Sequence, residues 1–204
     1  PRVGSVSTYF TQQNIGKANI SLDLKRPEAV DIIKTIAAQC DVLVENYRAG
    51  VMDKLGLGWD DLHAVNPGLI YASISGYGST GPWTQRRAYA SVINAESGMT
   101  GIQSRAHGGK PANDPHSHGD VYTGMETAAG ILAALFQRTR TGEGQRIDVS
   151  MAQSMLYVNE HTQSELFTGE VGDNVIRSFQ PGDYPVLTVG DGRDVLIAGH
   201  PAEA

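Results

Sequence analysis

The strongest constraint on the fold is an amphipathic helical pattern followed at once by a short apolar run. Over Pro27–Gln39 the apolar residues recur at the spacing of one helix face, and the proline stands where a first helical residue is expected. Asp41–Glu45 and, further along, Leu69–Ile74 have the length and composition of buried strands. Strands that alternate with helices predict a parallel sheet with right-handed crossovers, and therefore an α/β fold.

Other segments extend this alternation. The longest helical pattern starts at about Asp120 and runs to Arg140, with Gly142 just beyond it, as helix capping favours. Its buried face is expected to comprise Val121, Met125, Ala128, Ala129, Leu132, Leu135 and Phe136. We also expect strands at Asn19–Leu24 and Gly144–Ser150, helices at Val51–Leu55, Asp60–Val65, Tyr89–Thr100 and Met151–Leu166, a loop at Gly101–Gly119, and a β-hairpin formed by Pro185–Val189 and Asp194–Ala198.

Charge and cysteine content narrow the classes of partner and compartment. The chain has 16 basic and 22 acidic residues and a net charge of −6, so neither nucleic acid nor a membrane is expected as a partner. The longest uncharged apolar run, Ala128–Phe136, is too short to span a bilayer, and Pro1–Phe10 has no signal-peptide pattern. A single cysteine, Cys40, favours a reducing compartment, and a cytoplasmic location is expected.

Asp120 is the first candidate for chemistry. It stands at the start of the longest predicted helix, where the free N–H groups and the helix dipole stabilise a carboxylate. An ionised carboxylate in that position can act as a nucleophile. The alternative is that Asp120 is an ordinary N-cap residue.

A histidine motif overlaps this candidate. His116-Ser-His118-Gly-Asp120 has alternating side chains that can ligate zinc from a loop. His161 and His200 are isolated, so no second group of ligands is evident. We therefore favour a solvated loop with incidental histidines, and expect no metal.

Two predicted strands end in polar loops that contain glycine, Asn46–Gly50 and Ser75–Gly78. In open α/β sheets, ligands bind at the carboxyl ends of the strands. Backbone N–H groups of these turns, with Arg48 and Lys54, could hold a phosphate-bearing ligand. The chain has neither the dinucleotide-binding glycine motif nor a P-loop motif.

Ten sequence blocks carry a family resemblance. In order they are Asn14-Ile-Gly-Lys17, Ser21–Lys25, Asp41–Asn46, Leu55–Gly58, Asn66-Pro67, Ser73–Gly78, Thr80–Pro82, Gly119-Asp120, Gly130–Leu135 and Thr141–Gln145. Together they resemble the family III CoA-transferases over nearly the whole chain. The resemblance implies part of a Rossmann-like, CoA-binding large domain over residues 1–168, a linker over 169–184 and the start of a smaller α+β domain over 185–204. It also implies an interlocked homodimer, and a longer protein of which this chain is an internal or truncated piece.

The resemblance further implies an activity. Family members of the transferase type move CoA between an acyl-CoA thioester and a carboxylic acid, with no permanently bound cofactor. The aspartate that matches Asp120 attacks the thioester, and an aspartyl-CoA thioester follows. Gly119 would let the substrate approach the backbone closely. Residues that match the CoA groove of the family are Asn46, Tyr47, Arg48, Val51, Lys54, Leu55, Ser75 and Tyr77.

Two other functions stay open. The racemase branch of the family moves an α-proton of an acyl-CoA between a histidine and an aspartate, and Tyr89 stands where that histidine is expected. A tyrosine, with an ordinary pKa of about 10, is a poor proton acceptor near neutral pH, so CoA transfer is favoured. The remaining alternative is a non-catalytic remnant that binds CoA.

Overall fold

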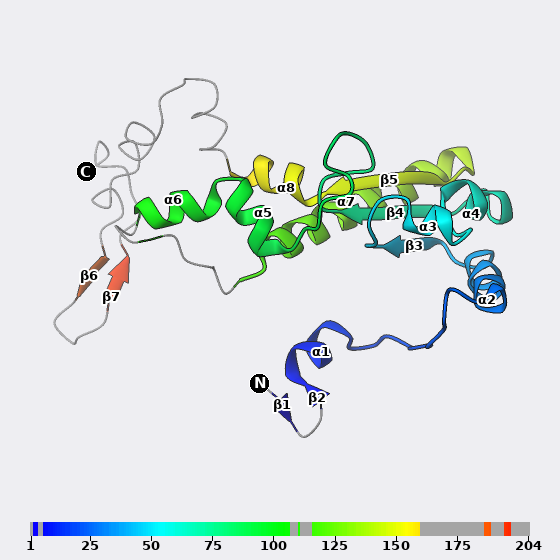
Figure 1. Cartoon of the computed structure of the whole chain (residues 1–204), viewed down its shortest axis with the longest axis horizontal. Coiled ribbons are helices and arrows are strands. Elements are labelled where there is room, and N and C mark those ends of the chain that lie inside the picture. The colour runs from blue at the N-terminus through cyan, green and yellow to red at the C-terminus, as the bar shows by residue number, and fades with distance from the viewer. Residues whose placement is uncertain are drawn as a thin grey trace.

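Figure 1 shows a computed structural model of the chain, which describes residues 2–3, 6–106, 110, 116–159, 186–188 and 194–196. Its centre is a three-stranded sheet in the order β3-β4-β5, formed by β3 (Val42–Glu45), β4 (Ile70–Ser75) and β5 (Gln145–Ser150). Both neighbouring pairs are parallel, with Val42 opposite Ile70 and Ile70 opposite Gln145. The predicted α/β fold with a parallel sheet is confirmed.

Three helices pack over one face of this sheet. They are α2 (Pro27–Ala37), α3 (Val51–Lys54) and α4 (Trp59–Val65), with bounds close to those predicted. The apolar core between them and the sheet consists of the buried residues Ala37, Met52, Leu57, Leu62, Leu69 and Tyr71. This core holds in place the turn that connects β3 to α3, and that turn carries Asn46–Gly50.

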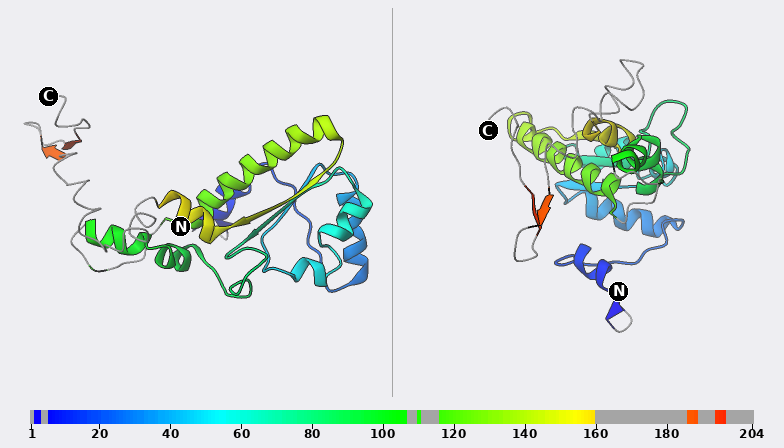
Figure 2. Two further views of the ribbon diagram at one scale, coloured as in Figure 1. Left: turned by 90° about the horizontal axis from the view of Figure 1, so that it is seen from above. Right: turned by 90° about the vertical axis from the view of Figure 1, so that its left-hand side faces the viewer.

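The long helix α7 (His118–Thr141) lies over the opposite face and runs antiparallel to the strands (Figure 2). Near its C-terminus, the Arg138 guanidinium donates to Asp41 Oδ1 at 2.7 Å and to the Gly68 carbonyl oxygen at 2.8 Å. Both partners come just before strands, so this end of α7 is held at the amino edge of the sheet. Its N-terminus, with Asp120, consequently lies at the carboxyl edge.

The predicted buried face of α7 is wrong, although the helix itself is confirmed. Four of the apolar residues expected in the core are more than half exposed: Val121, Met125, Leu132 and Phe136. Small residues face the packed side instead: Gly119, Thr123, Thr127, Gly130 and Ala134. The two threonine hydroxyls donate to carbonyl oxygens one turn earlier, at 2.5 and 2.7 Å, so their burial leaves no unpaired hydroxyl. Small side chains allow closer packing of a helix on a sheet, which favours this face over the more hydrophobic one.

The segment between β4 and α7 also differs from the prediction. One helix was expected over Tyr89–Thr100, but there are two, α5 (Ala90–Glu96) and α6 (Met99–Ala106). Gly98 separates them with φ 81°, a left-handed conformation that ends a helix. The start of the predicted Gly101–Gly119 loop is therefore helical. After β5 follows α8 (Met151–Val158), which packs against α5 and α7.

No strand forms at Asn19–Leu24, because no neighbouring strand pairs with it in the described part of the chain. β3 was expected to be buried, but it is an edge strand and Val44 is 54% exposed. Before this segment, β1 (Arg2–Val3) pairs with β2 (Val6–Ser7), and α1 (Thr8–Gln13) follows. These elements stand away from the sheet (Figure 1).

The predicted C-terminal hairpin is confirmed in its two strands, β6 (Val186–Thr188) and β7 (Asp194–Leu196), which pair antiparallel. The predicted linker at 169–184 and the end of the predicted helix Met151–Leu166 lie outside the described residues. Among the helices that the structure describes, none combines the length and the apolar character needed to cross a bilayer.

Two glycine substitutions test the packing of this fold. A Cβ on Gly144 would lie 2.0 Å from the Leu69 carbonyl oxygen, a backbone atom that cannot turn aside. We expect Gly144→Ala to lower the free energy of unfolding by at least about 2 kcal/mol, as overpacking does. Gly124, within α7, has open space where a Cβ would stand, and Gly124→Ala is expected to raise stability by about 0.5–1 kcal/mol. Urea unfolding followed by circular dichroism measures both; equal effects would contradict the packing described.

Candidate active site

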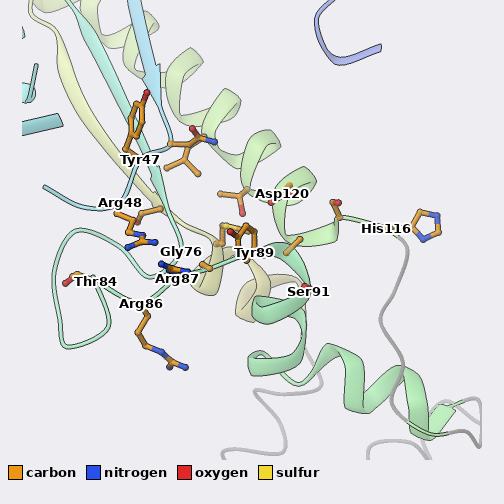
Figure 3. Close-up of a pocket in the computed structure, with 18 residues that line it drawn as sticks. Tyr47, Arg48, Gly76, Thr84, Arg86, Arg87, Tyr89, Ser91, His116 and Asp120 are labelled. Carbon is orange, nitrogen blue, oxygen red and sulfur yellow. The ribbon is translucent and has the colours of Figure 1, made fainter. Parts of the chain in front are cut away.

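A cavity of about 670 Å³ opens at the carboxyl edge of the sheet (Figure 3). Its walls come from the turns after β3 and β4, the segment leading into α5, the first turns of α7 and the start of α8. The lining residues are Asn46, Tyr47, Arg48, Ile74, Ser75, Gly76, Thr84, Arg86, Arg87, Ala88, Tyr89, Ala90, Ser91, His116, Ser117, Asp120, Thr123 and Met151. The two loops and the carboxylate singled out in the sequence therefore line one space.

Asp120 is the third residue of α7 and projects into this cavity. The N-cap is Ser117, so the interpretation of Asp120 as an ordinary N-cap is wrong. No residue in the described part of the chain donates a hydrogen bond to the Asp120 carboxylate. The side chain is exposed, but the cavity walls displace enough water to raise the pKa of its carboxyl above the ordinary value. The carboxylate is thus open to a ligand and only partly hydrated.

Gly119 has a different role from the one expected. It is buried, and a Cβ there would lie 3.3 Å from both Ala90 Cα and Met151 Cε. The missing side chain lets the first turn of α7 pack closely on the starts of α5 and α8. Gly119 therefore positions Asp120 through helix packing and does not provide space for a substrate.

Ser75 and Gly76 form a tight turn at the end of β4. The Ser75 hydroxyl accepts a hydrogen bond from the Gly78 N–H at 2.9 Å, and the Gly76 carbonyl accepts one from the Ala152 N–H at 3.0 Å. A Cβ on Gly76 would lie 2.2 Å from that of Ala88. Any side chain at position 76 would therefore collide with Ala88, so only glycine fits at this point of the cavity wall.

Three arginines line the cavity, and the sequence motifs had indicated only Arg48. Arg48 and Arg87 point into the space in front of Asp120, whereas Arg86 points away (Figure 3). Within the described residues, neither Arg48 nor Arg87 has an ion-pair partner, but Arg86 is paired with Glu96 at 2.5 Å. The missed signal was the Arg86-Arg87 doublet, which follows a glycine-rich loop. The result is a cavity with two inward-pointing guanidinium groups and one carboxylate.

Tyr89 lines the same cavity as Asp120 (Figure 3). It is the N-cap residue of α5 and is 69% exposed. Thr84 and Ser91 also line the cavity, and no sequence motif had identified them.

The residues expected to contact CoA divide into groups. Asn46, Tyr47, Arg48 and Ser75 line the cavity of Asp120. Lys54 and Leu55 line a second cavity of about 500 Å³, together with Leu24, Lys25, Pro27, Val30 and Asp31. Val51 and Tyr77 line neither of these two cavities. The residues predicted to contact CoA therefore line two cavities, and the prediction that they form one CoA-binding groove stays a prediction.

The two histidines of the proposed zinc motif are arranged as stacked rings. The ring centroids of His116 and His118 are 5.5 Å apart, and those of His118 and Tyr122 are 5.8 Å apart. Within the described ranges, no three histidine, cysteine or acidic side chains come together as a metal site would require.

Known proteins are similar to this chain in sequence and in fold. Residues 1–203 match the family model of CoA-transferase family III. The chain is 38% identical over 170 residues to succinyl-CoA:glutarate CoA-transferase of Homo sapiens, covering 83% of the chain and 39% of that protein. It is 39% identical over 153 residues to formyl-CoA:oxalate CoA-transferase of Afipia carboxidovorans, covering 74% and 35%.

A solved structure agrees with these matches. A crystal structure of a CAIB/BAIF family protein from Brucella suis superposes with a TM-score of 0.76 at 32% identity, covering 90% of this chain and 48% of that one. The chain therefore spans less than half the length of each of these three proteins. Because the family match extends along nearly all of the chain and the parallel sheet with its covering helices recurs in a solved relative, the chain belongs to CoA-transferase family III.

Proposed function

We propose that the full-length protein containing this chain transfers CoA between an acyl-CoA and a carboxylic acid, with Asp120 as the nucleophile. One observation carries the proposal: an accessible carboxylate, to which none of the described residues donates a hydrogen bond, lies in the same cavity as the turns after β3 and β4. Relatives named as CoA-transferases support the reaction class.

The proposed reaction consists of two successive acyl exchanges at the carboxyl group of Asp120. The Asp120 carboxylate attacks the thioester carbonyl carbon, the C–S bond breaks, and CoA leaves as a thiolate. A mixed anhydride between Asp120 and the acyl group remains. The thiolate then attacks the Asp120 carbonyl carbon and releases the first acid as a carboxylate, which leaves an aspartyl-CoA thioester. The acceptor carboxylate repeats these steps in the opposite direction and regenerates Asp120.

Charges around the cavity support this chemistry. The first N–H groups of α7 lack intrahelical acceptors, as at any helix N-terminus, and can stabilise a developing oxyanion. Arg48 and Arg87 add positive charge where both substrates are anions. The partial loss of water that raises the Asp120 pKa also makes its carboxylate a stronger nucleophile once ionised.

For CoA, we propose that Asn46, Tyr47, Arg48 and Ser75 bind the thioester end beside Asp120. The second cavity would take the nucleotide end, because Lys25 and Lys54 supply charge for phosphates and Leu24, Val30 and Leu55 supply apolar surface for adenine. Contacts of CoA with Val51 and Tyr77 stay predictions. CoA enters as a substrate in this proposal, and no permanently bound cofactor is assigned.

We further propose an interlocked homodimer with a domain division at residues 169–184, and a cytoplasmic location in keeping with the single cysteine. The exposed apolar stripe on α7, formed by Val121, Met125, Leu132 and Phe136, supports the dimer. A stripe of this kind is typical of a surface that another part of a protein covers.

A covalent adduct tests the nucleophile. Intact-mass measurement of the full-length protein after addition of succinyl-CoA or formyl-CoA should show an adduct that hydroxylamine removes. Asp120→Asn should form none, because an amide oxygen does not attack a thioester at a useful rate. An adduct that persists in Asp120→Asn would place the nucleophile elsewhere, and solvent deuterium entering the α-carbon without transfer would indicate the racemase.

Binding variants provide the control for this experiment. Asp120→Asn should still bind CoA by calorimetry, since it removes no proposed CoA contact. Lys54→Gln should bind CoA more weakly, by about tenfold for the loss of one charge-assisted phosphate contact, but should keep the adduct at saturating acyl-CoA. Equal loss of binding in both variants would contradict the proposed placement of CoA.

The direction of the Asp120 pKa shift predicts how stability depends on pH. Because the pKa of the Asp120 carboxyl is raised in the folded protein, ionisation of this group lowers the free energy of unfolding. This loss of stability develops as the pH rises through the raised pKa. Asp120→Asn should therefore have a higher Tm than the wild type at neutral pH. The difference should shrink as the pH falls toward the ordinary carboxyl pKa of about 3.9. Thermal unfolding across this range measures it, and a constant difference would contradict the assignment.

Sedimentation of the full-length protein tests the dimer. Leu132→Glu and Phe136→Glu place charges on the exposed stripe of α7 and should convert a dimer to monomers without changing the helical content. Val65→Glu, on an exposed position of α4, is the matched control and should leave the dimer intact. A monomeric wild type would contradict the proposal.

A further inference from the structure

Four side chains form a cluster next to the candidate active site, which we name the Arg86 cluster: Tyr77, Trp83, Arg86 and Glu96. The Arg86 guanidinium carbon lies 4.7 Å from the Trp83 ring centroid and 5.3 Å from that of Tyr77. The two rings meet edge to face with centroids 5.7 Å apart. The Glu96 carboxylate accepts from Arg86 at 2.5 Å through one oxygen and from the Tyr77 hydroxyl through the other.

This cluster closes the loop of residues 76–89. Tyr77 lies at the start of the loop and Arg86 near its end, and both bond to Glu96, the last residue of α5. A further hydrogen bond joins the loop to the turn after β3, from Gln85 Nε2 to the Ala49 carbonyl oxygen at 3.3 Å. These contacts connect the loop to α5 and to the turn after β3, and the Gly76 carbonyl and the Ser79 N–H connect its first half to α8 and β5.

The same loop supplies one wall of the cavity. Arg87 and Tyr89, at the end of the loop, line the cavity together with Asp120 (Figure 3). Asp120 itself belongs to α7, which packs on β4, β5 and α8 as well as on α5. We therefore expect a change confined to the loop to move the binding wall more than the carboxylate.

We infer that the Arg86 cluster is a positioning device that holds Arg87 and Tyr89 at the cavity and so sets the affinity for acyl-CoA. The inference rests on the proposed function for its link to CoA. Trp83 and Glu96 do not line the cavity, and Trp83 is 54% exposed, so the stacking of Arg86 on Trp83 and the Arg86–Glu96 ion pair do not belong to an apolar core. What these contacts determine is the position of the loop.

An ordered wall lowers the conformational cost of binding. If loss of the cluster leaves the binding-competent loop populated about one tenth of the time, the apparent affinity falls about tenfold. The reaction of bound substrate with Asp120 is unchanged, so KM rises and kcat stays constant. A purely structural contribution would lower the amount of folded enzyme without this separation of KM from kcat.

Matched variants of the full-length protein test the inference. Trp83→Ala removes the aromatic face and Trp83→Phe keeps one, while Glu96→Gln keeps the shape of the side chain and removes its charge. Arg140→Ala, which removes a similar contact with Phe136 at 5.1 Å and lies at the far end of α7, is the control. The first measurement is tryptic cleavage after Arg87 without substrate, and the second is the KM and kcat for acyl-CoA.

We expect Trp83→Ala and Glu96→Gln to be cleaved about tenfold faster and to have KM raised about tenfold at constant kcat. Trp83→Phe and Arg140→Ala should resemble the wild type. Unchanged cleavage, a loss confined to kcat, or faster cleavage with unchanged KM would each overturn the inference. If the wild type transfers no CoA, that result contradicts the proposed function but not the role of the cluster. Tryptic cleavage then still tests the cluster, and the affinity for CoA, measured by calorimetry, takes the place of KM.

Discussion

The packing of α7 on the parallel sheet is the contact on which the candidate site depends. Small residues on one side of this helix, including Gly119 and Gly130, allow it to lie close to β5 and α8. At its other end, Arg138 joins it to the segments that precede β3 and β4. Since the helix is rigid and antiparallel to the strands, these two contacts together deliver Asp120 to the edge where the strand-end turns gather.

The cavity joins three structural units whose chemical contributions differ. The helix provides the carboxylate, the strand-end turns provide backbone groups and Arg48, and the loop of residues 76–89 provides Arg87 and Tyr89. Arg48 and Arg87 place positive charge on two walls of the cavity, and the partly desolvated Asp120 carboxylate lies on the third. In the reaction proposed above, this arrangement attracts the anionic substrates to the Asp120 carboxylate, and the nearby guanidinium groups reduce the repulsion between the negative charges.

The distribution of apolar surface indicates how the chain relates to a longer protein. The core under α2, α3 and α4 is closed, with Leu57 and Leu62 fully buried, whereas the outer face of α7 and the edge strand β3 remain open. The two curated CoA-transferases are more than twice as long and have additional chain with which to cover such surfaces.

The sequence by itself determined the alternation of strands and helices, the parallel sheet and the position of Asp120 at a helix start, because these follow from periodicity and local capping along the chain. Periodicity also located α7, but it could not show which side faces the sheet. Close packing favours Thr123 and Thr127 over Leu132, and only the tertiary structure decides that. The packing role of Gly119, the placement of Lys54 and Ser75 in different cavities and the presence of Arg87 in the cavity of Asp120 likewise depend on contacts between segments far apart in the chain, which no local pattern encodes.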